Sequence, residues 1–577
     1  MKKSIRIITA VILALCMCAA CAFAPVYATA GVPISAQSDD AKMKFGKGVI
    51  KAFGFAADSL ITGVAKLFPR IDWPTEQEYK SENFMPGSEI IRTEAAENAH
   101  WSVGFASESI IPEDIGEVGY VRAGNFHIKE ELTYKVMEGD DQCIKAVALS
   151  DGSGSGTVIF CSLDAFGISG TNVRNIRAAI LKAAADSGIR DIISINVTVT
   201  HTHSALDTHG LGAGILNLLG DSIKAGFYRL VGKEYKVSSL NENLMNNLFG
   251  KAAKAAVRAC QSMQTGSLRF SAFDIADMLY DKQFPLVYDE NVNVIKFTPD
   301  SESARDIWLV NMGCHPVRMT SYDYVCSDYP EAISRFADSM ANADVAFYQG
   351  SQLAITKDDS ALSYDTDEYE RQPDNARKAF FLLNEFGKEI VSRIMHNDPV
   401  ESFLIEPYLN IAHKEIKIPV TSSLILLISK INMLNNAVIS NTGKLNDVKV
   451  VTEIGYCELG GRLAIALVPG EIDPAIIWGG VYGADKSWNG TDWEFEPFSE
   501  MACGRKLIVY GLTNDQIGYI VPDNDFAHPF ASLFEDLIGG SRNKHYEEMI
   551  SLGKNTASAV TKSFSDLTDE VNSQKFD

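Results

Sequence analysis

The chain lacks several features that would place it in common classes of protein. After residue 68 it has no hydrophobic run long enough to span a membrane. Basic residues are in deficit, because 52 Lys and Arg stand against 74 Asp and Glu and give a formal net charge of −22. That deficit argues against nucleic acid as a partner, since phosphates need a basic surface. No internal repeats or low-complexity linkers appear, and a hydrophobic fraction of 46% indicates a globular protein.

Cysteine is also sparse. Three of the ten cysteines lie in the first thirty residues, and the other seven are Cys143, Cys161, Cys260, Cys314, Cys326, Cys457 and Cys503. An odd number without C-x-x-C spacing does not form a disulfide framework. One or two bridges stay open for an exported protein, and the sequence does not fix their pairing.

Residues 1–30 form a predicted signal peptide. A basic start with Lys2 and Lys3 precedes an apolar stretch, and Ala28-Thr29-Ala30 supplies an A-x-A cleavage signal. We therefore expect a secreted or cell-envelope protein whose mature chain begins near Gly31. Cys21, which follows two alanines, leaves a lipid-anchored form open as the less favoured alternative.

Residues 31–100 are predicted to be an N-terminal amphipathic and linker segment. Between positions 43 and 68, four lysines alternate with Phe, Val, Ile and Leu. A basic amphipathic segment of this kind suits peripheral contact with a membrane surface. Packing against the main domain is the competing interpretation, and several glycines weaken a helix here.

Residues 101–577 are predicted to form one catalytic domain of the α/β class, with mixed β-sheet layers flanked by helices. Apolar runs predict strands over 144–148, 156–163, 191–199, 268–273, 292–297, 307–312, 462–468 and 506–512, and helical spacing predicts helices over 171–186 and 251–263. The strand, helix and strand between 156 and 199 imply a parallel pair. Functional residues then belong at the carboxyl ends of the strands.

The first candidate site residues follow the strand that ends at Val199. If the chain stays extended through His201-Thr202-His203, both imidazoles point to one side. Two nitrogen ligands on a rigid element suit a zinc site. Histidines that simply cap a sheet are the competing interpretation, although a third histidine, His209, follows closely.

Three more strands end at residues that can bind a metal. His315 follows the strand 307–312, Glu471 follows 462–468, and Tyr519 lies just beyond 506–512. His, His and Glu are a common catalytic zinc set with one position left open, whereas tyrosine is a less usual ligand. Each residue alone could be a turn, surface or core residue. Their shared placement predicts a Zn²⁺ site at the strand ends.

The order of short motifs resembles the neutral/alkaline (non-lysosomal) ceramidase family. From about Val103 to the C-terminus the chain carries THTHS at 200–204, GCHP at 313–316, SDYPE at 327–331, PGE at 469–471, TND at 513–515 and HYEE at 545–548. The resemblance implies that His201, His315, Glu471 and Tyr519 bind one zinc ion. It also implies that His203 and Tyr546 contact the scissile group.

The chain departs from that family at three places. The serine loop reads Gln349-Gly350-Ser351-Gln352, so that Ser351 is only a candidate for the displaced catalytic serine. The region 278–285 holds no substrate-binding arginine, and Lys282 replaces its charge without its forked geometry. Because the chain ends soon after HYEE, we expect little room for the immunoglobulin-like domain of longer members.

The resemblance implies a secreted zinc-dependent amidohydrolase. It would cleave the N-acyl amide bond of ceramide or a related N-acyl lipid to a fatty acid and a sphingoid base. A zinc hydrolase of the same family acting on a different amide or ester is an alternative, as is a non-catalytic lipid- or cell-envelope-binding protein. The apolar stretches 211–219 and 423–431 could line a groove for alkyl chains or belong to the core. Asp164, at a strand end, could orient a histidine ligand or be an ordinary strand-end residue.

Overall fold

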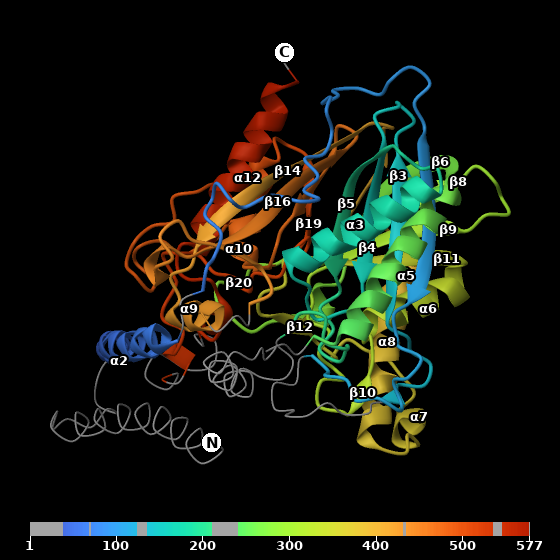
Figure 1. Ribbon diagram of the computed structural model, residues 1–577. Helices are drawn as coiled ribbons and strands as arrows, with labels where there is room; N and C mark the ends of the chain where they lie inside the picture. The colour runs from blue at the N-terminus through green and yellow to red at the C-terminus, as the bar shows by residue number, and fades with distance from the viewer. Residues whose placement is uncertain are drawn as a thin grey trace.

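The computed structural model describes residues 39–68, 71–123, 135–210, 240–430, 434–532, 534 and 545–575. The predicted signal peptide, the Cys21 anchor and the apolar stretch 211–219 lie outside these residues. Within them the fold is mixed α/β, as predicted, with two β-sheets at the centre and helices on their outer faces (Figure 1).

The larger sheet has nine strands in the order β11-β9-β8-β6-β1-β3-β4-β5, with β13 also paired to β6. Its strands are β1 Trp101–Ser109, β3 Cys143–Ser150, β4 Thr157–Leu163, β5 Ile192–Val199, β6 Gln264–Asp274, β8 Asn291–Pro299, β9 Asp306–Met312, β11 Ala343–Gln349 and β13 Glu401–Ile405. The pairs β4–β5 and β9–β11 are parallel, which confirms the parallel pair predicted between 156 and 199.

The second sheet has five strands in the order β14-β16-β17-β19, with β15 paired to β16. Its strands are β14 Leu409–Pro419, β15 Ala437–Ile439, β16 Lys449–Leu459, β17 Leu463–Leu467 and β19 Lys506–Tyr510. Three short pairs complete the strands: β2 Lys135–Val136 with β10 Tyr324–Val325, β7 Leu279–Asp281 with β12 Ile355–Lys357, and β18 Glu471–Ile472 with β20 Tyr519–Ile520.

Helices cover the outer faces of the large sheet (Figure 1). The helices are α2 Asp39–Leu67, α3 Gly170–Asp186, α5 Glu242–Gln261, α6 Tyr329–Ala341, α7 Thr366–Glu370, α8 Asn375–His396, α9 Ser423–Lys430, α10 Pro474–Trp478, α11 Phe498–Met501 and α12 Thr556–Ser573, with short 3₁₀ turns η2 Ala276–Met278, η3 Leu445–Asp447 and η5 Glu547–Ile550. In α3, Ser169 caps the first turn, and Val173, Ile176 and Ile180 at helical spacing are buried against β4 and β5.

The large sheet folds back on itself. Strand β11, at one end of the hydrogen-bonded order, lies against β3, β4 and β5 at the other end. Ser162 in β4 donates a hydrogen bond to the Phe347 carbonyl in β11 at 2.6 Å, and Tyr348 in β11 donates to the Phe160 carbonyl in β4 at 3.3 Å. Consequently the ends of β5 and β9, far apart in the strand order, come close together in space.

The second sheet meets the same place through β19. Gly511, just after β19, donates its N–H to the Gln349 carbonyl at 2.9 Å. A Cβ on Gly511 would stand 2.7 Å from the Gly350 carbonyl oxygen, and a Cβ on Gly313 would stand 2.4 Å from that of Ser351. Glycine is therefore required at both strand ends, because only bare backbone permits this approach.

Segment 43–68 is helical despite its glycines, and it packs against the body of the protein. Phe53 of α2 contacts Phe534 with ring centroids 5.1 Å apart, and Asp58 accepts a hydrogen bond from Ser423 of α9 at 2.6 Å. Among the described residues, Lys44–Lys66 is the one helical stretch long and apolar enough to cross a membrane, a test that buried or N-terminal helices also pass. Within residues 71–100, the part from Ser81 to Arg92 runs alongside β14, where the Ser88 N–H donates to the Ile411 carbonyl.

The expected strands match the observed ones to within a few residues, but one helix and the cysteine bridges differ. Helix α5 begins at Glu242 rather than 251, because Asn241 caps it and Leu244 to Leu248 extend its buried face. The described part of the stretch 423–431, residues 423–430, belongs to the core through helix α9, whose Ile425, Leu427 and Ile428 are buried. All seven cysteines within the described residues are free, so neither possible bridge forms there.

Candidate metal centre

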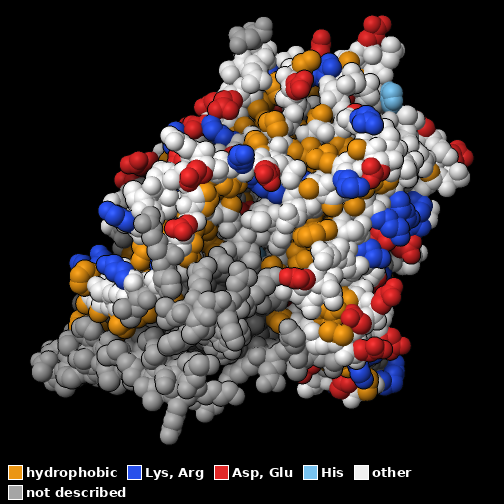
Figure 2. Space-filling view, viewed as in Figure 1, with side chains coloured by type: hydrophobic (Ala, Val, Ile, Leu, Met, Phe, Trp, Pro, Cys, Tyr) orange, Lys and Arg blue, Asp and Glu red, His pale blue; other side chains and the backbone are white. Residues whose placement is uncertain are grey.

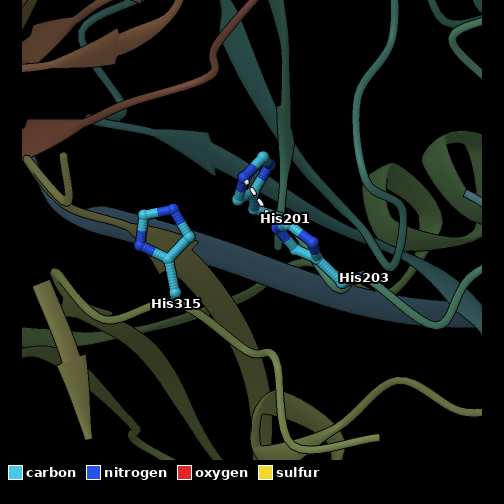
Figure 3. A group of neighbouring side chains, drawn as sticks. All are labelled: His201, His203 and His315. Atoms are coloured by element: carbon cyan, nitrogen blue, oxygen red, sulfur yellow. Dashed lines mark hydrogen bonds between the residues drawn. The ribbon is translucent and has the colours of Figure 1, made fainter. Parts of the chain in front are cut away.

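His201 and His203 lie on a turn directly after β5. The backbone at His201 has φ 63°, a left-handed conformation, so the expected extended chain is wrong at this residue. The turn nevertheless brings the two imidazoles together, with their Nε2 atoms 3.3 Å apart (Figure 3). Phe166, just after β4, stacks on the His201 ring at 4.7 Å and meets the His203 ring edge-on at 4.8 Å. One aromatic side chain thus positions both histidines.

His315 approaches the pair from the end of β9. Its ring centroid lies 5.2 Å from that of His201 (Figure 3). Its Nδ1 donates to the Ile355 carbonyl at 2.9 Å, which fixes the ring orientation. The SDYPE motif supports this strand end, because Asp328 caps α6 and the Tyr329 hydroxyl donates to the Cys314 carbonyl at 2.6 Å. The nitrogen atoms available for ligation on His201, His203 and His315 all lie within 4.8 Å of one another.

Glu471, on β18, faces two of these imidazoles. Its Oε2 lies 3.0 Å from His315 Nε2 and 3.3 Å from His201 Nε2. Gln516 donates its side-chain amide to the other oxygen, Oε1, at 3.3 Å. Burial raises the pKa of the Glu471 carboxyl, but positive charge on the two imidazoles, when they are protonated, outweighs burial and holds that pKa well below its usual range. Glu471 is therefore an anion in a buried site.

The hydrogen-bond pattern fits a cation between these groups. The Nδ1 atoms of His201 and His315 each face a backbone carbonyl, Phe166 O at 2.7 Å and Ile355 O at 2.9 Å. A carbonyl only accepts, so each Nδ1 carries the proton and each Nε2 of a neutral ring presents its lone pair to the Glu471 carboxylate. Lone pairs facing an anion need a proton or a metal ion between them. A metal ion satisfies the imidazoles and the carboxylate together.

The surroundings of His203 and His315 favour neutral rings. Burial and the neighbouring imidazoles lower the pKa of His203 well below its ordinary value. Burial likewise lowers the pKa of His315, although Glu471 opposes that shift. Neutral imidazoles are the form that binds metals, so this cluster can hold a metal ion at neutral pH.

Tyr519 and Tyr546 flank the carboxylate. Strands β18 and β20 pair in parallel with Glu471 opposite Tyr519. The Tyr519 and Tyr546 rings meet edge-on at 6.0 Å. Burial, with the nearby carboxylates, raises the pKa of both phenols, so both are hydroxyl donors at neutral pH. The structure thus places Tyr519 opposite Glu471. The third imidazole near those of His201 and His315 is that of His203.

The other predicted residues take different places. Ser351 is buried beside Gly313, and its hydroxyl has no hydrogen-bond partner among the described residues. Lys282 follows β7 and lies close enough for its charge to lower the pKa of His203 and His315. His209 contacts the Gln516 carbonyl at 3.3 Å, outside the imidazole group. Asp164 accepts from the Cys143 N–H at 3.0 Å rather than orienting a histidine.

Sequence reasoning missed the groups that orient the ligands. These are the Phe166 ring and carbonyl, the Ile355 carbonyl and the Gln516 amide. Backbone carbonyls carry no sequence signal. Position was the one usable clue, because Phe166 follows a strand end and Gln516 lies three residues before Tyr519.

Comparison with known proteins gives a likeness in structure only. No protein-family model matches the chain, and no curated protein matches it in sequence. The neutral ceramidase from Pseudomonas aeruginosa superposes with a TM-score of 0.57 at 13% identity, over 83% of this chain and 75% of the ceramidase chain. A ceramidase complexed with C2 superposes with a TM-score of 0.55 at 12% identity, over 83% and 76% of the two chains. The protein therefore has the fold of the neutral ceramidases, with a cluster of three imidazoles at its strand ends.

Proposed function

We propose that this protein is a zinc-dependent amidohydrolase that cleaves the N-acyl amide bond of a ceramide or a related N-acyl lipid. The observation that carries the proposal is the convergence of His201, His315 and Glu471, with His203 beside them, in a fold shared with neutral ceramidases. His201, His315 and Glu471 would hold the ion, with Tyr519 or His203 as a further ligand. Bound zinc lowers the pKa of a coordinated water to about 7 and polarises a carbonyl oxygen.

The chain's own residues supply positioning and hydrogen bonds. Half-buried His203 and the Tyr546 hydroxyl are the donors proposed for the oxygen that becomes negative in the transition state. Such a donor is worth about 2.7–4 kcal/mol when it is well placed. The nearby positive charge of Lys282 acts in the same direction. Ser351 stays a candidate catalytic residue, because its unpartnered hydroxyl is buried at a neighbouring strand end.

Metal analysis and substrate hydrolysis test the proposal separately. We expect one zinc ion per chain in the wild-type protein, and its loss in His201→Ala and His315→Ala. His203→Ala separates two roles: retained zinc with lost hydrolysis indicates a substrate contact, whereas lost zinc indicates a ligand. Absence of bound metal in the wild type would leave lipid or cell-envelope binding without catalysis. Bound zinc without release of a sphingoid base from any ceramide would favour the alternative, a different amide or ester.

The same proposal includes export and contact with a lipid surface. Helix α2 presents Phe55, which is 77% exposed, together with the exposed lysines Lys51 and Lys66. Figure 2 shows hydrophobic and lysine side chains next to one another where α2 lies. A basic helix with an exposed aromatic ring suits an anionic bilayer surface. Phe55→Ser should weaken co-sedimentation with anionic vesicles, and unchanged binding would remove α2 from the proposal.

A further inference from the structure

A polar cavity of about 540 Å³ lies near the metal centre, because its wall residue Glu547 follows Tyr546, whose ring meets that of Tyr519 at 6.0 Å. Several wall residues neighbour proposed site residues in sequence: Gln283 follows Lys282, Val521 lies two residues after Tyr519, and Glu547 follows Tyr546. The 3₁₀ turn η5 forms one side, and α2 reaches the cavity with Lys44 and Lys47. We call this space the acid cavity because Glu547, Glu548 and Asp525 line it.

Two carboxylates in the wall are incompletely bonded. Glu547 is 2% exposed, and its Oε2 accepts from the Gln283 amide at 2.9 Å. Glu548 is completely buried, and its Oε1 accepts from the Ala527 N–H at 3.0 Å. The second oxygens, Glu547 Oε1 and Glu548 Oε2, have no hydrogen-bond partner among the described residues. Buried carboxylate oxygens are costly without a donor, so these two point to a ligand that donates.

The cations around the cavity do not fill that need. Lys47 donates to the Ser487 and Trp488 carbonyls, and His545 bonds Glu548 through the oxygen that is already occupied. Lys44 and Lys486 are exposed residues of the rim. Burial and the charge of Glu548 raise the pKa of Glu547 to about 8 against the opposing charge of His545, so a cationic ligand would displace a proton from this carboxyl at neutral pH.

Size and geometry favour an organic cation over a metal ion. A volume of about 540 Å³ lies in the range of small-molecule sites. Within the described part of the chain, three metal-ligating atoms converge only at His201, His203 and His315, so the cavity acids do not form a metal cage.

We propose that the acid cavity binds an organic ammonium group, so that the amide substrate carries a positively charged amino group beside its amide. The cavity's binding is independent of catalysis. The statement about the substrate rests on the proposed function, because it requires hydrolysis at the nearby metal centre. A wall of carboxylates and lysines suits such a polar group better than it suits a second alkyl chain.

Calorimetry on the full-length, zinc-loaded protein tests the binding, with 1,6-diaminohexane as the probe and 1,6-hexanediol as its uncharged analogue. We expect the diamine to bind at least about tenfold more tightly than the diol, since charge-assisted hydrogen bonds are the strong ones. Glu547→Gln should weaken diamine binding about tenfold, whereas Glu302→Gln, an exposed acid outside the cavity, should not. Equal binding of the two probes, no binding, or binding of Ca²⁺ in place of the diamine would overturn the proposal.

A rim substitution covers the case in which Glu547→Gln fails to fold. Ala484 lines the cavity and is exposed, so a charge there leaves the core intact. Ala484→Lys should weaken diamine binding and Ala484→Glu should strengthen it, each by a few-fold at low salt. The same affinity in both variants would contradict a cation site.

Hydrolysis separates the two proposals. N-dodecanoyl-1,6-diaminohexane and N-dodecanoyl-hexylamine differ only in the terminal amino group, and we expect the first to be cleaved faster. Diamine binding without hydrolysis of either amide would refute the proposed function and leave the cavity site standing. Equal cleavage of both would support the amidohydrolase and overturn the inference about its substrate.

Discussion

Replacing Gln516 with leucine should loosen the metal without unfolding the protein. The Gln516 amide donates to Glu471 Oε1 at 3.3 Å, which leaves Oε2 toward His201 and His315. Leucine removes this donor but keeps the volume of the side chain. The backbone oxygen of residue 516, which accepts from His209, is unchanged by the substitution.

The expected size follows from the bond. A hydrogen bond to a charged group contributes about 1.5–3 kcal/mol, and a separation of 3.3 Å places this one at the weak end. A loss of about 1.5 kcal/mol corresponds to roughly tenfold weaker zinc binding. Mutation of a residue that hydrogen-bonds to a metal ligand usually weakens metal binding by about 10- to 100-fold. The expected tenfold loss lies at the lower end of that range.

Competition with a chromogenic chelator measures the zinc affinity, and thermal unfolding of the metal-free protein measures the fold. Gln352→Leu is the matched control, because Gln352 is fully buried and neither atom of its amide has a partner among the described residues. We expect a tenfold loss in Gln516→Leu and no change in Gln352→Leu. Equal zinc affinity in Gln516→Leu and the wild type would refute the proposed role of this amide.

Two further predictions concern stability. Burial lowers the pKa of His545, but Glu548 and neighbouring acids outweigh it and raise that pKa to about 9. Because the folded pKa exceeds the unfolded value near 6.5, this stabilisation is fully present below about pH 6.5 and is lost as pH rises through 9. Urea unfolding at several pH values should show the loss in the wild type and a smaller one in His545→Gln; parallel curves would contradict it. Gly511→Ala should destabilise the protein by about 1–3 kcal/mol, since its Cβ would stand 2.7 Å from the Gly350 oxygen. An unchanged denaturation midpoint would show that the backbone at these strand ends can shift to accept a Cβ without loss of stability.

The sequence predicted eight of the strands and the residues at their ends because both depend on local pattern, whereas β1, β11, β14 and β16 were not predicted. Alternating apolar residues identified β5, and continuous apolar runs identified β9, β17 and β19. The ends of those strands then pointed to His201, His315 and Glu471. The imidazoles of His201 and His203 do lie together, but a left-handed residue turns the chain there in place of the extended backbone that was predicted.

What the sequence could not predict depends on long-range packing. The folding back of the large sheet joins β11 to β4 through side chains more than 180 residues apart, and no local pattern encodes that contact. The apolar stretch 423–431 fitted a substrate groove or a core equally well until α2 was seen to cover it. Whether Tyr519 or His203 is the further ligand beside His201, His315 and Glu471 likewise depends on side-chain positions that the sequence does not specify.

The recurved sheet brings together candidate metal ligands from two strands that do not pair with each other. His201 follows β5 and His315 follows β9, which stand six places apart in the strand order, yet their rings are neighbours. An ion bound by both histidines would link the ends of β5 and β9, which are not joined to each other by backbone hydrogen bonds. Separating the ends of β5 and β9 would then require loss of the ion, so binding of the ion would favour the folded-back form of the sheet.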